Sequence, residues 1–514
     1  MHSEEKILKR EYIIYIIVYI ATSTLAVAQA FGYEHIISSS EKGESIWLWS
    51  ILTIICIVLY FFTNRFCFVG RRVFGQKLAY YLQKKHISDN YELSYINFEK
   101  INSGEWLTKL FNDISSVANF YSNEVLLLIA GALEFFLCLV YGFIYSIELT
   151  LVILISSVLS VIVPKVLEKY LKETKNKEQE NKENVNAFIN NIIDNLDVIK
   201  SYSSLNFILK IFGEKYKGYY NSVIDNRKVN ALNFSIGFGL GVLVNLVWIV
   251  VGIYLISIDR LTISSFVGFM VLEEMFAWPF RILPKTFSAY SEMKVSKSRL
   301  NIKYEKWDSN LKYDNLNNDV ILKTSDLVFS YDNNVNVIKM SDFEIYKNER
   351  VALVGESGCG KSTTLKILLN LYDKFKGDVI WQEGLKVGYI SQTNVLFNST
   401  IRENITFFNE GYKEEDIIQV CKEACIYDFL MTLEKGLDTI IDDTELSGGQ
   451  VQRVVLARVL LIKPDVFILD EFSASIDIDT QHKIFENLKK IDATFIMVLH
   501  KQEAINFCNR SIRI

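Results

Sequence analysis

The chain has 514 residues, of which 50% are apolar and 22% are charged, and its formal net charge is −5 at pH 7. This length exceeds that of one domain, and the apolar composition is typical of a membrane component rather than a soluble protein. The negative net charge argues against a nucleic-acid partner, because duplex-binding proteins concentrate basic residues on one face. The cysteines follow no disulfide or zinc-binding pattern, so we expect reduced thiols.

Long apolar segments in the first 290 residues predict six membrane-spanning helices, because about 20 predominantly apolar residues cross a bilayer. In chain order they are residues 12–33, 45–64, 125–144, 149–164, 234–258 and about 262–290. A cleaved signal peptide is the alternative for the first segment, since Lys6, Lys9 and Arg10 precede it. Its apolar run is longer than a usual signal core, which favours a span.

Basic residues gather before the first span and after the second and fourth spans, in residues 65–85 and 165–177. The other connections hold few basic residues, so the positive-inside rule places both termini in the cytoplasm. The connections 65–117 and 165–230 show helical periodicity and are too polar for lipid. We therefore expect the membrane helices to continue into the cytosol.

Several polar or aromatic residues fall at membrane depth, where ionisable groups are costly and usually face a cavity or a partner. The candidates for a substrate cavity are Glu134, Trp248, Glu273, Glu274 and Trp278. Two alternatives remain open for the acidic members. Glu274 would pair with Arg281, or the side chains would lie near an interface and reach out to water.

Residues 355–362 match the phosphate loop G-x-x-x-x-G-K-[ST], whose backbone N–H groups surround the phosphates of a nucleotide. The residues in question are Gly355, Gly358, Cys359, Gly360, Lys361 and Ser362. In this motif the Lys reaches the β- and γ-phosphates and the Ser hydroxyl binds Mg²⁺. An apolar strand is predicted before the loop and a helix after it, so the N-terminus of that helix would face the phosphates. A nucleotide should protect the thiol of Cys359.

Two carboxylates end a second apolar strand, which is predicted over residues 466–469. Asp470 is suited to bind Mg²⁺, and Glu471 is suited to polarise an attacking water. Gln392 offers an amide to Mg²⁺ and to the water. His500 suits a contact with the γ-phosphate, although a lone His is more often structural.

Ser447, Gly448, Gly449 and Gln450 immediately precede or begin a predicted helix over residues 450–461. They again present backbone N–H groups and a hydroxyl at a helix N-terminus. One ATP molecule does not need two such cradles in one chain. We therefore expect the second cradle to close on the nucleotide of another chain.

The ordered set of phosphate loop, Gln392, LSGGQ, Asp470-Glu471 and His500 resembles the ATP-binding cassette (ABC) transporters, specifically exporters with six membrane helices fused in front of one nucleotide-binding domain. By position, the resemblance implies an adenine-stacking aromatic at Tyr331, a Walker A motif from Gly355 to Thr363, a signature from Ser447 to Gln450, a Walker B pair at Asp470 and Glu471, a dimer-loop aspartate at Asp477 and a switch histidine at His500. It also implies short coupling helices near residues 90–100 and 190–203.

The chain departs from the family pattern at Ala474, where a serine is usual, and in a short segment before the signature, residues 438–445. The C-terminal helices that many relatives carry are also not expected. These departures leave every catalytic group in place. They put in doubt the cross-dimer contact of the missing serine and the coupling through the short segment.

The resemblance implies an all-α transmembrane domain at residues 1–300, a linker at 301–318 and an α/β P-loop nucleotide-binding domain at 319–514. We expect a multi-pass protein of the cytoplasmic membrane that binds ATP and Mg²⁺. Because one chain holds all the catalytic residues, a homodimer is the simpler assembly, and a heterodimer is the alternative.

The expected function is ATP-driven export by alternating access, with a peptide as the preferred cargo. No N-terminal peptidase domain is expected, because only about ten residues precede the first span. Export of drugs or flipping of lipids is the alternative activity. A membrane-anchored ATPase that regulates without transport is the hypothesis from another class.

Overall fold

The computed structural model describes the chain except residues 1, 100, 102, 203–204, 302–305, 317–318, 332–337, 340–341, 357, 442–445, 474 and 500–506. The side chains of residues 2–3, 159–168, 280–281 and 284 also lie outside the description. The chain forms two compact units. A helical unit comprises Met1–Ser88 and Ser103–Ile302, and an α/β unit comprises Asp89–Asn102 and Lys303–Ile514.

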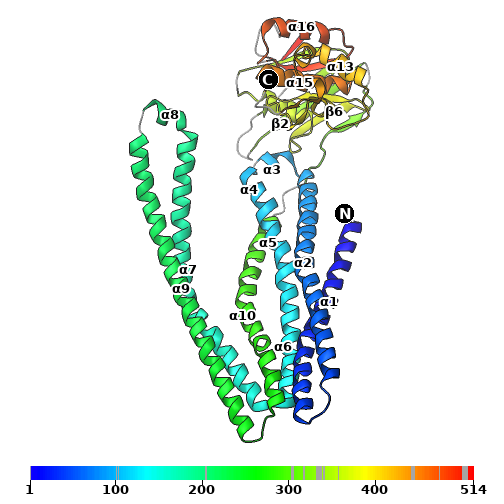
Figure 1. Ribbon diagram of the computed structural model, residues 1–514. Helices are drawn as coiled ribbons and strands as arrows, with labels where there is room; N and C mark the ends of the chain where they lie inside the picture. The colour runs from blue at the N-terminus through cyan, green and yellow to red at the C-terminus, as the bar shows by residue number, and fades with distance from the viewer. Residues whose placement is uncertain are drawn as a thin grey trace. The chain divides into compact units, whose positions relative to one another are not determined.

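The helical unit consists of long helices and several short helical segments (Figure 1). They are α1 (His2–Glu41), α2 (Trp47–Tyr91), α4 (Ser103–Thr108), η1 (Lys109–Asp113), α5 (Ile114–Asn119), η2 (Phe120–Glu124), α6 (Val125–Tyr145), α7 (Ile147–Asp194), α8 (Leu196–Ser201), α9 (Leu205–Ser257) and α10 (Ile263–Leu300). Local capping sets two of the turns. Ser146 accepts a hydrogen bond from the backbone N–H of Leu149 before α7, and Thr262 accepts one from Ser265 before α10.

Among the described residues, four helical stretches are long and apolar enough to cross a membrane: Glu4–Glu41, Trp47–Tyr91, Ser103–Tyr145 and Leu205–Ser257. They contain four of the six expected spans. The other two expected spans fall on α7, which begins with the apolar run Ile147–Val158, and on α10. Helices α7 and α9 run side by side to α8, and over that length they diverge from α6 and α10 (Figure 1).

Close helix packing in this unit centres on Tyr141, which is fully buried on α6. Its ring lies edge-on to Phe269 of α10, with ring centroids 5.5 Å apart. Gly268 permits this approach, since a Cβ there would lie 1.7 Å from the Tyr141 hydroxyl. Trp248 belongs to the same cluster, is 4% exposed and donates its indole N–H to Asn245. The structure therefore places Trp248 in the packed core.

The α/β unit contains a five-stranded parallel sheet in the order β12 (Arg510–Arg513), β5 (Arg350–Val354), β11 (Thr494–Val498), β10 (Val466–Asp470) and β7 (Val387–Ile390). A second five-stranded sheet has β1 (Lys312–Asp314), β6 (Lys376–Gln382), β2 (Val320–Phe329) and β3 (Ile338–Lys339), with β4 (Phe343–Tyr346) also paired to β2. A small sheet joins β8 (Ser399–Thr400) to β9 (Ile440–Ile441). Strand β1 lies within the stretch expected to be a linker.

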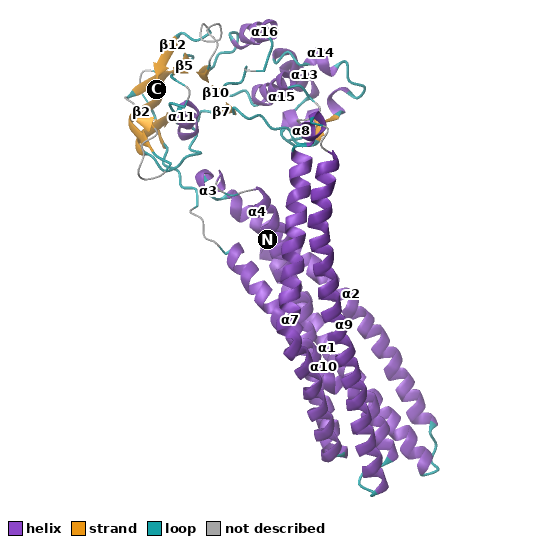
Figure 2. Ribbon diagram, turned by 90° about the vertical axis from the view of Figure 1, so that its left-hand side faces the viewer, coloured by secondary structure: helices purple, strands orange, loops and turns teal. Residues whose placement is uncertain are grey.

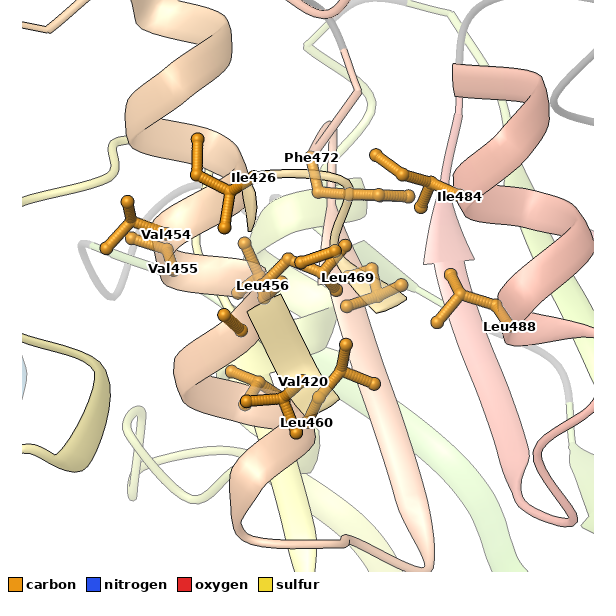
Figure 3. Packing of buried hydrophobic residues seen from close by; sticks show 14 of the residues in the cluster. Val420, Ile426, Val454, Val455, Leu456, Leu460, Leu469, Phe472, Ile484 and Leu488 are labelled. Atoms are coloured by element: carbon orange, nitrogen blue, oxygen red, sulfur yellow. The ribbon is translucent and has the colours of Figure 1, made fainter. Parts of the chain in front are cut away.

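The helices of this unit are α3 (Tyr95–Glu99), α11 (Lys361–Leu368), α12 (Ile401–Thr406), α13 (Glu414–Glu423), α14 (Tyr427–Leu430), η3 (Gly436–Asp438), α15 (Gly448–Leu461) and α16 (Ile478–Leu488). In Figure 2 the strands gather mainly on one side of the unit and α13, α14 and α15 on the other. One hydrophobic core joins the two sides, where Leu456 and Leu460 of α15 pack against Val420 of α13 and Leu469 of β10 (Figure 3).

Strands β10 and β11 are buried along their whole length, as the continuous apolar pattern of parallel strands predicts. Phe467 and Phe495 stack in their centre, with ring centroids 4.7 Å apart and planes 8° apart. This pair anchors the strand that ends in the two carboxylates.

Phe467→Ala should lower the free energy of unfolding of the α/β unit by about 3–5 kcal/mol, because it removes a buried ring and leaves a cavity. The shift would be measured as the urea midpoint of ATPase loss in the full-length protein. Ile440→Ala, at a side chain that is 64% exposed, is the control and should change stability by less than about 0.5 kcal/mol. Equal midpoints for the two variants would contradict the central role of the ring stack.

Candidate functional site

The carboxyl ends of four parallel strands meet at one edge of the sheet. The register pairs Asp470 with Val498, Val498 with Leu353, and Leu469 with Ile390. The phosphate loop, Gln392 and the Asp470-Glu471 pair follow these strand ends directly. This edge is where open α/β sheets bind ligands. His500 would follow β11 but lies outside the described residues.

The phosphate loop connects β5 to the N-terminus of α11. Gly358 and Gly360 adopt φ values of +82° and +102°, which favour glycine. The ammonium group of Lys361 donates to the carbonyl oxygens of Gly355 and Glu356 at 3.0 and 2.9 Å, so the loop wraps around this side chain. Thr364 donates to the Gly360 carbonyl and fixes the first turn of α11.

The strand-end carboxylates differ in their surroundings. Asp470 is 1% exposed, and burial raises the pKa of its carboxyl group, against the effect of a hydrogen bond from Ser362. Glu471 has φ of +50°, which is strained for a residue other than glycine. Its side chain accepts a hydrogen bond of 3.0 Å from the Gln392 amide. The structure thus brings Ser362, Gln392, Asp470 and Glu471 together.

The oxygen atoms of Ser362, Gln392 and Asp470 are suited to bind a magnesium ion. The Oδ1 atom of Asp470 is buried and has no hydrogen-bond partner among the described residues, a costly arrangement that a cation would relieve. The hydroxyl of Ser362 and the amide oxygen of Gln392 are further hard oxygen ligands of the kind that Mg²⁺ prefers.

Tyr331 is 44% exposed, and its hydroxyl lies 3.0 Å from Thr363 Oγ1 at the start of α11. The Tyr331 hydroxyl also lies 3.3 Å from that of Tyr372, whose ring is perpendicular to its own. The aromatic side chain is therefore tied to the phosphate loop by its hydroxyl group. This arrangement leaves part of the Tyr331 side chain open for a ligand.

The structure adds a contact that the motifs did not reveal. Tyr372 donates to Glu99 of α3 at 2.8 Å, and Lys366 of α11 pairs with the same carboxylate at 2.8 Å. Ser94, just before α3, donates to Asp373 at 3.0 Å. Burial raises the pKa of the Tyr372 hydroxyl, which keeps it a donor. No sequence signal joins these positions, because more than 260 residues separate the partners.

The signature forms the N-terminus of α15 as a capping box. Ser447 accepts a hydrogen bond from the Gln450 backbone, and the Gln450 side chain accepts one from the Ser447 backbone at 2.8 Å. A Cβ on Gly449 would lie 2.7 Å from the carbonyl oxygen of Ser475, so only glycine fits. Gly448 lies against the Ser475 side chain. Between described residues, no hydrogen bond or ion pair joins this signature to the phosphate loop of the same chain.

Asp477 caps α16 by accepting a hydrogen bond of 2.9 Å from the backbone of Thr480. This bond lowers the pKa of the Asp477 carboxyl group. A helix-capping role is therefore visible for Asp477, alongside the dimer-loop role that the resemblance implies. Ala474 lies outside the described residues.

Three of the five cavity candidates line one cavity of about 400 Å³ in the helical unit: Glu134, Glu274 and Trp278. Glu134 accepts a hydrogen bond from Ser23 at 3.1 Å. Glu273 and the core residue Trp248 are not among the lining residues. The alternative ion pair of Glu274 with Arg281 falls on a side chain outside the description. Sequence analysis missed Arg71, which also lines the cavity.

A maleimide should inhibit ATP hydrolysis by reacting with Cys359, and Mg-ATP should protect the enzyme. This thiol is half-buried in the phosphate loop, whereas burial raises the pKa of Cys421 and of Cys508 to about 12 and suppresses their thiolates. Labelling followed by mass spectrometry and ATPase assay checks the site. Cys359→Ser should hydrolyse ATP and resist the reagent, and inhibition of this variant would place the sensitive thiol elsewhere.

Two family models match the sequence. The ABC transporter transmembrane region matches residues 12–280, and the ABC transporter model matches residues 338–474. The second match includes the phosphate loop, Gln392, the signature and the Asp470-Glu471 pair. Tyr331, Asp477 and His500 lie beyond it.

Curated relatives align over most of the chain. The uncharacterized ABC transporter ATP-binding protein YknU of Bacillus subtilis is 26% identical over 451 residues, which cover 84% of this chain and 77% of YknU. The alpha-hemolysin translocation ATP-binding protein HlyB of Escherichia coli is 26% identical over 81% of this chain and 61% of its own length. The leukotoxin translocation ATP-binding protein LktB of Mannheimia glucosida also shows 26% identity, with the same coverage of 81% and 61%.

Among solved structures, a bacterial Atm1-family ABC exporter with ATP bound has the same fold, with a TM-score of 0.78 over 99% of this chain and 94% of that one at 19% identity. The transmembrane-region model covers more than half of this sequence. The chain therefore belongs to the ABC transporter family, as an exporter-type membrane domain fused to an ATPase domain that couples ATP hydrolysis to transport.

Proposed function

We propose that two copies of this chain form an exporter that moves a peptide out of the cytoplasm, driven by ATP closed between their α/β units. The observation that carries the proposal is the signature at the start of α15. It presents a capped helix N-terminus suited to phosphate, and within the described residues no hydrogen bond or ion pair joins it to the phosphate loop of its own chain. A second copy would supply the missing half of each site.

The helical unit offers a second reason for a dimer. Helices α7 and α9 leave α6 and α10 and carry α8 at their far end (Figure 1). Around α8, the side chains of Leu196, Val198 and Tyr202 are 47%, 49% and 79% exposed. Exposed apolar side chains on a polar helical extension favour a partner surface. In our proposal that surface belongs to the second copy.

Each site residue would have its own role in ATP binding or hydrolysis. Tyr331 would stack on adenine, while Lys361 and the N–H groups around Gly355, Gly358 and Gly360 would hold the phosphates. Ser362, Gln392 and Asp470 would hold Mg²⁺, which supplies charge neutralisation between the β- and γ-phosphates. Glu471 would orient and polarise the water, helped by the hydrogen bond from Gln392. His500 and the partner's signature would contact the γ-phosphate.

The proposed location is the cytoplasmic membrane with both chain termini in the cytoplasm. The basic residues near the start of α1, in the second half of α2 and along α7 support this orientation. Catalytic groups on the α/β unit would then meet cytoplasmic ATP. The exported cargo would leave through the helical units.

A peptide cargo is supported by two relatives whose names describe translocation of polypeptide toxins, alpha-hemolysin and leukotoxin. This chain spans 61% of the length of each of them. Export of a drug or movement of a lipid is the rival, because the cavity in the helical unit also has aromatic walls.

Glu471→Gln should keep ATP binding and dimer closure but slow hydrolysis by about 100-fold or more, because the amide cannot polarise the water. Single-turnover hydrolysis and ATP binding would be measured on the same preparation. Glu383→Gln, at a residue in the turn after β6, is a matched control outside the site. Near-normal turnover in Glu471→Gln would remove Glu471 from its proposed role.

Native mass spectrometry of the purified transporter should show a dimer of identical chains. ATP-dependent uptake of peptide into inverted vesicles should accompany it and should vanish in Glu471→Gln. Hydrolysis without any vectorial movement would instead support a membrane-anchored regulator. Stable isolation of a complex with a different ABC chain would replace the homodimer by a heterodimer.

A further inference from the structure

Two adjoining cavities lie in the helical unit, and a single chain builds both. The acidic cavity, of about 400 Å³, is lined from α1, α2, α6 and α10 and includes Glu134, Glu274, Tyr60 and Trp278. The basic cavity, of about 520 Å³, is lined by Arg71, Arg72 and uncharged polar groups of α2, α5 and η2. Both volumes are in the range of small-molecule sites.

Arg71 lines both cavities, as does Leu127 of α6. The guanidinium group of Arg71 lies over the Phe68 ring, 5.1 Å from its centroid. Its Nε atom is buried and has no hydrogen-bond partner among the described residues. A guanidinium uses Nε together with a terminal nitrogen to bind a carboxylate bidentately. The unpartnered donor therefore indicates an anionic group of a ligand.

Two other cations, Lys285 and Arg72, line the basic cavity, and the first of them is already neutralised. Lys285 pairs at 3.1 Å with Glu124, which is 1% exposed and also accepts a hydrogen bond from Asn123. Arg72 is exposed and lies over the same Phe68 ring. Arg71 is thus the half-buried cationic group at the junction, and its buried Nε atom is placed to receive an anion.

The acidic cavity, in contrast, favours a cationic group of a ligand. Glu134 is anchored by a hydrogen bond from Ser23, which is fully buried. Glu274 lines the same cavity with Trp278 and Tyr60, whose rings offer faces that attract cations. Carboxylates at membrane depth are costly unless an opposite charge compensates them. A cationic ligand group would provide that compensation for Glu134, whose hydrogen-bond partner Ser23 is uncharged.

The length of α6 that borders the two cavities gives the span that a ligand would cover. Leu127 borders both cavities, and Glu134 lies two turns further along α6, which corresponds to about 10 Å at 1.5 Å per residue. An extended peptide covers that distance in about three residues. The walls between the ends are apolar or aromatic, including Phe68, Val271 and Met275.

We propose that these adjoining cavities bind a peptide segment that carries both charges, with its C-terminal carboxylate at Arg71 and a cationic group about three residues earlier at Glu134. This assignment rests on the proposed peptide export and names the class of cargo. It also locates the site inside one helical unit, built by α1, α2, α6 and α10 without a contribution from the second copy.

Four peptides test the charge assignment: acetyl-Lys-Phe-Ala-Leu as free acid and as amide, and the same pair with Gln in place of Lys. Binding to the full-length transporter in nanodiscs would be measured by calorimetry without nucleotide. The free acid with Lys should bind about tenfold or more tighter than either singly neutralised peptide, because each loses one charge-assisted hydrogen bond. Equal binding of all four peptides would overturn the proposal.

Two variants test which residue binds which charged group of the peptide. Arg71→Gln should abolish the preference for free acid over amide and keep the preference for Lys over Gln. Glu134→Gln should abolish the preference for Lys over Gln and keep the preference for free acid over amide. Lys77→Gln, which removes an α2 cation paired with Glu11 outside both cavities, should keep both preferences. A uniform loss of all four peptides, with their ratios unchanged, would show a structural effect and contradict the assignment.

The outcomes separate this inference from the proposed export. ATP-driven uptake of peptides regardless of charge would keep the export function and overturn the charged site. Displacement of the peptides by phosphatidylethanolamine, together with peptide-independent stimulation by that lipid, would assign the cavities to a lipid headgroup instead and overturn the proposal.

Discussion

The nucleotide site depends on the register of β10 in the parallel sheet. Leu469 pairs with Ile390 of β7, and Asp470 pairs with Val498 of β11. This register brings Glu471 within hydrogen-bond distance of Gln392 and places Asp470 beside Ser362. A shift by one residue would turn every side chain of β10 to the other face and separate these groups. The stack of Phe467 on Phe495 stabilises the register at the strand centre.

The helical unit faces a different physical constraint, because its polar groups lie where water is scarce. Glu124 is compensated by Lys285, and Asp113 by Ser296 and Arg299. Glu134 accepts a hydrogen bond from the uncharged Ser23, and Arg71 has a buried Nε atom without a hydrogen-bond partner among the described residues. Both residues line the acidic cavity, which is why we assign this cavity to cargo.

Within the α/β unit, the short helix α3 joins the segment that continues from α2 to residues beside the phosphate loop. Its Glu99 binds Lys366 and Tyr372, and Tyr372 in turn contacts Tyr331 beside the phosphate loop. Residues 89–102 begin in the last turn of α2, yet they belong to the α/β unit. A chain segment that continues from a membrane helix therefore shares hydrogen bonds with the residues that would hold adenine. The position of α3 agrees with the short helix expected near residues 90–100, and α8 with that near 190–203.

The features that the sequence alone determined are those that depend on residues close together in the chain. The phosphate loop, the carboxylates after β10 and the capping box at Ser447 each depend on neighbouring residues, so their spacing identified both the family and the nucleotide chemistry. Most apolar spans were likewise evident from their length. The tertiary structure decided which face of a helix meets which neighbour. It placed Trp248 in the core and Trp278 at a cavity, although both are tryptophans at membrane depth. It also brought Arg71 to Glu134's cavity and Glu99 to Tyr372, because contacts between residues so distant in sequence arise only when helices pack.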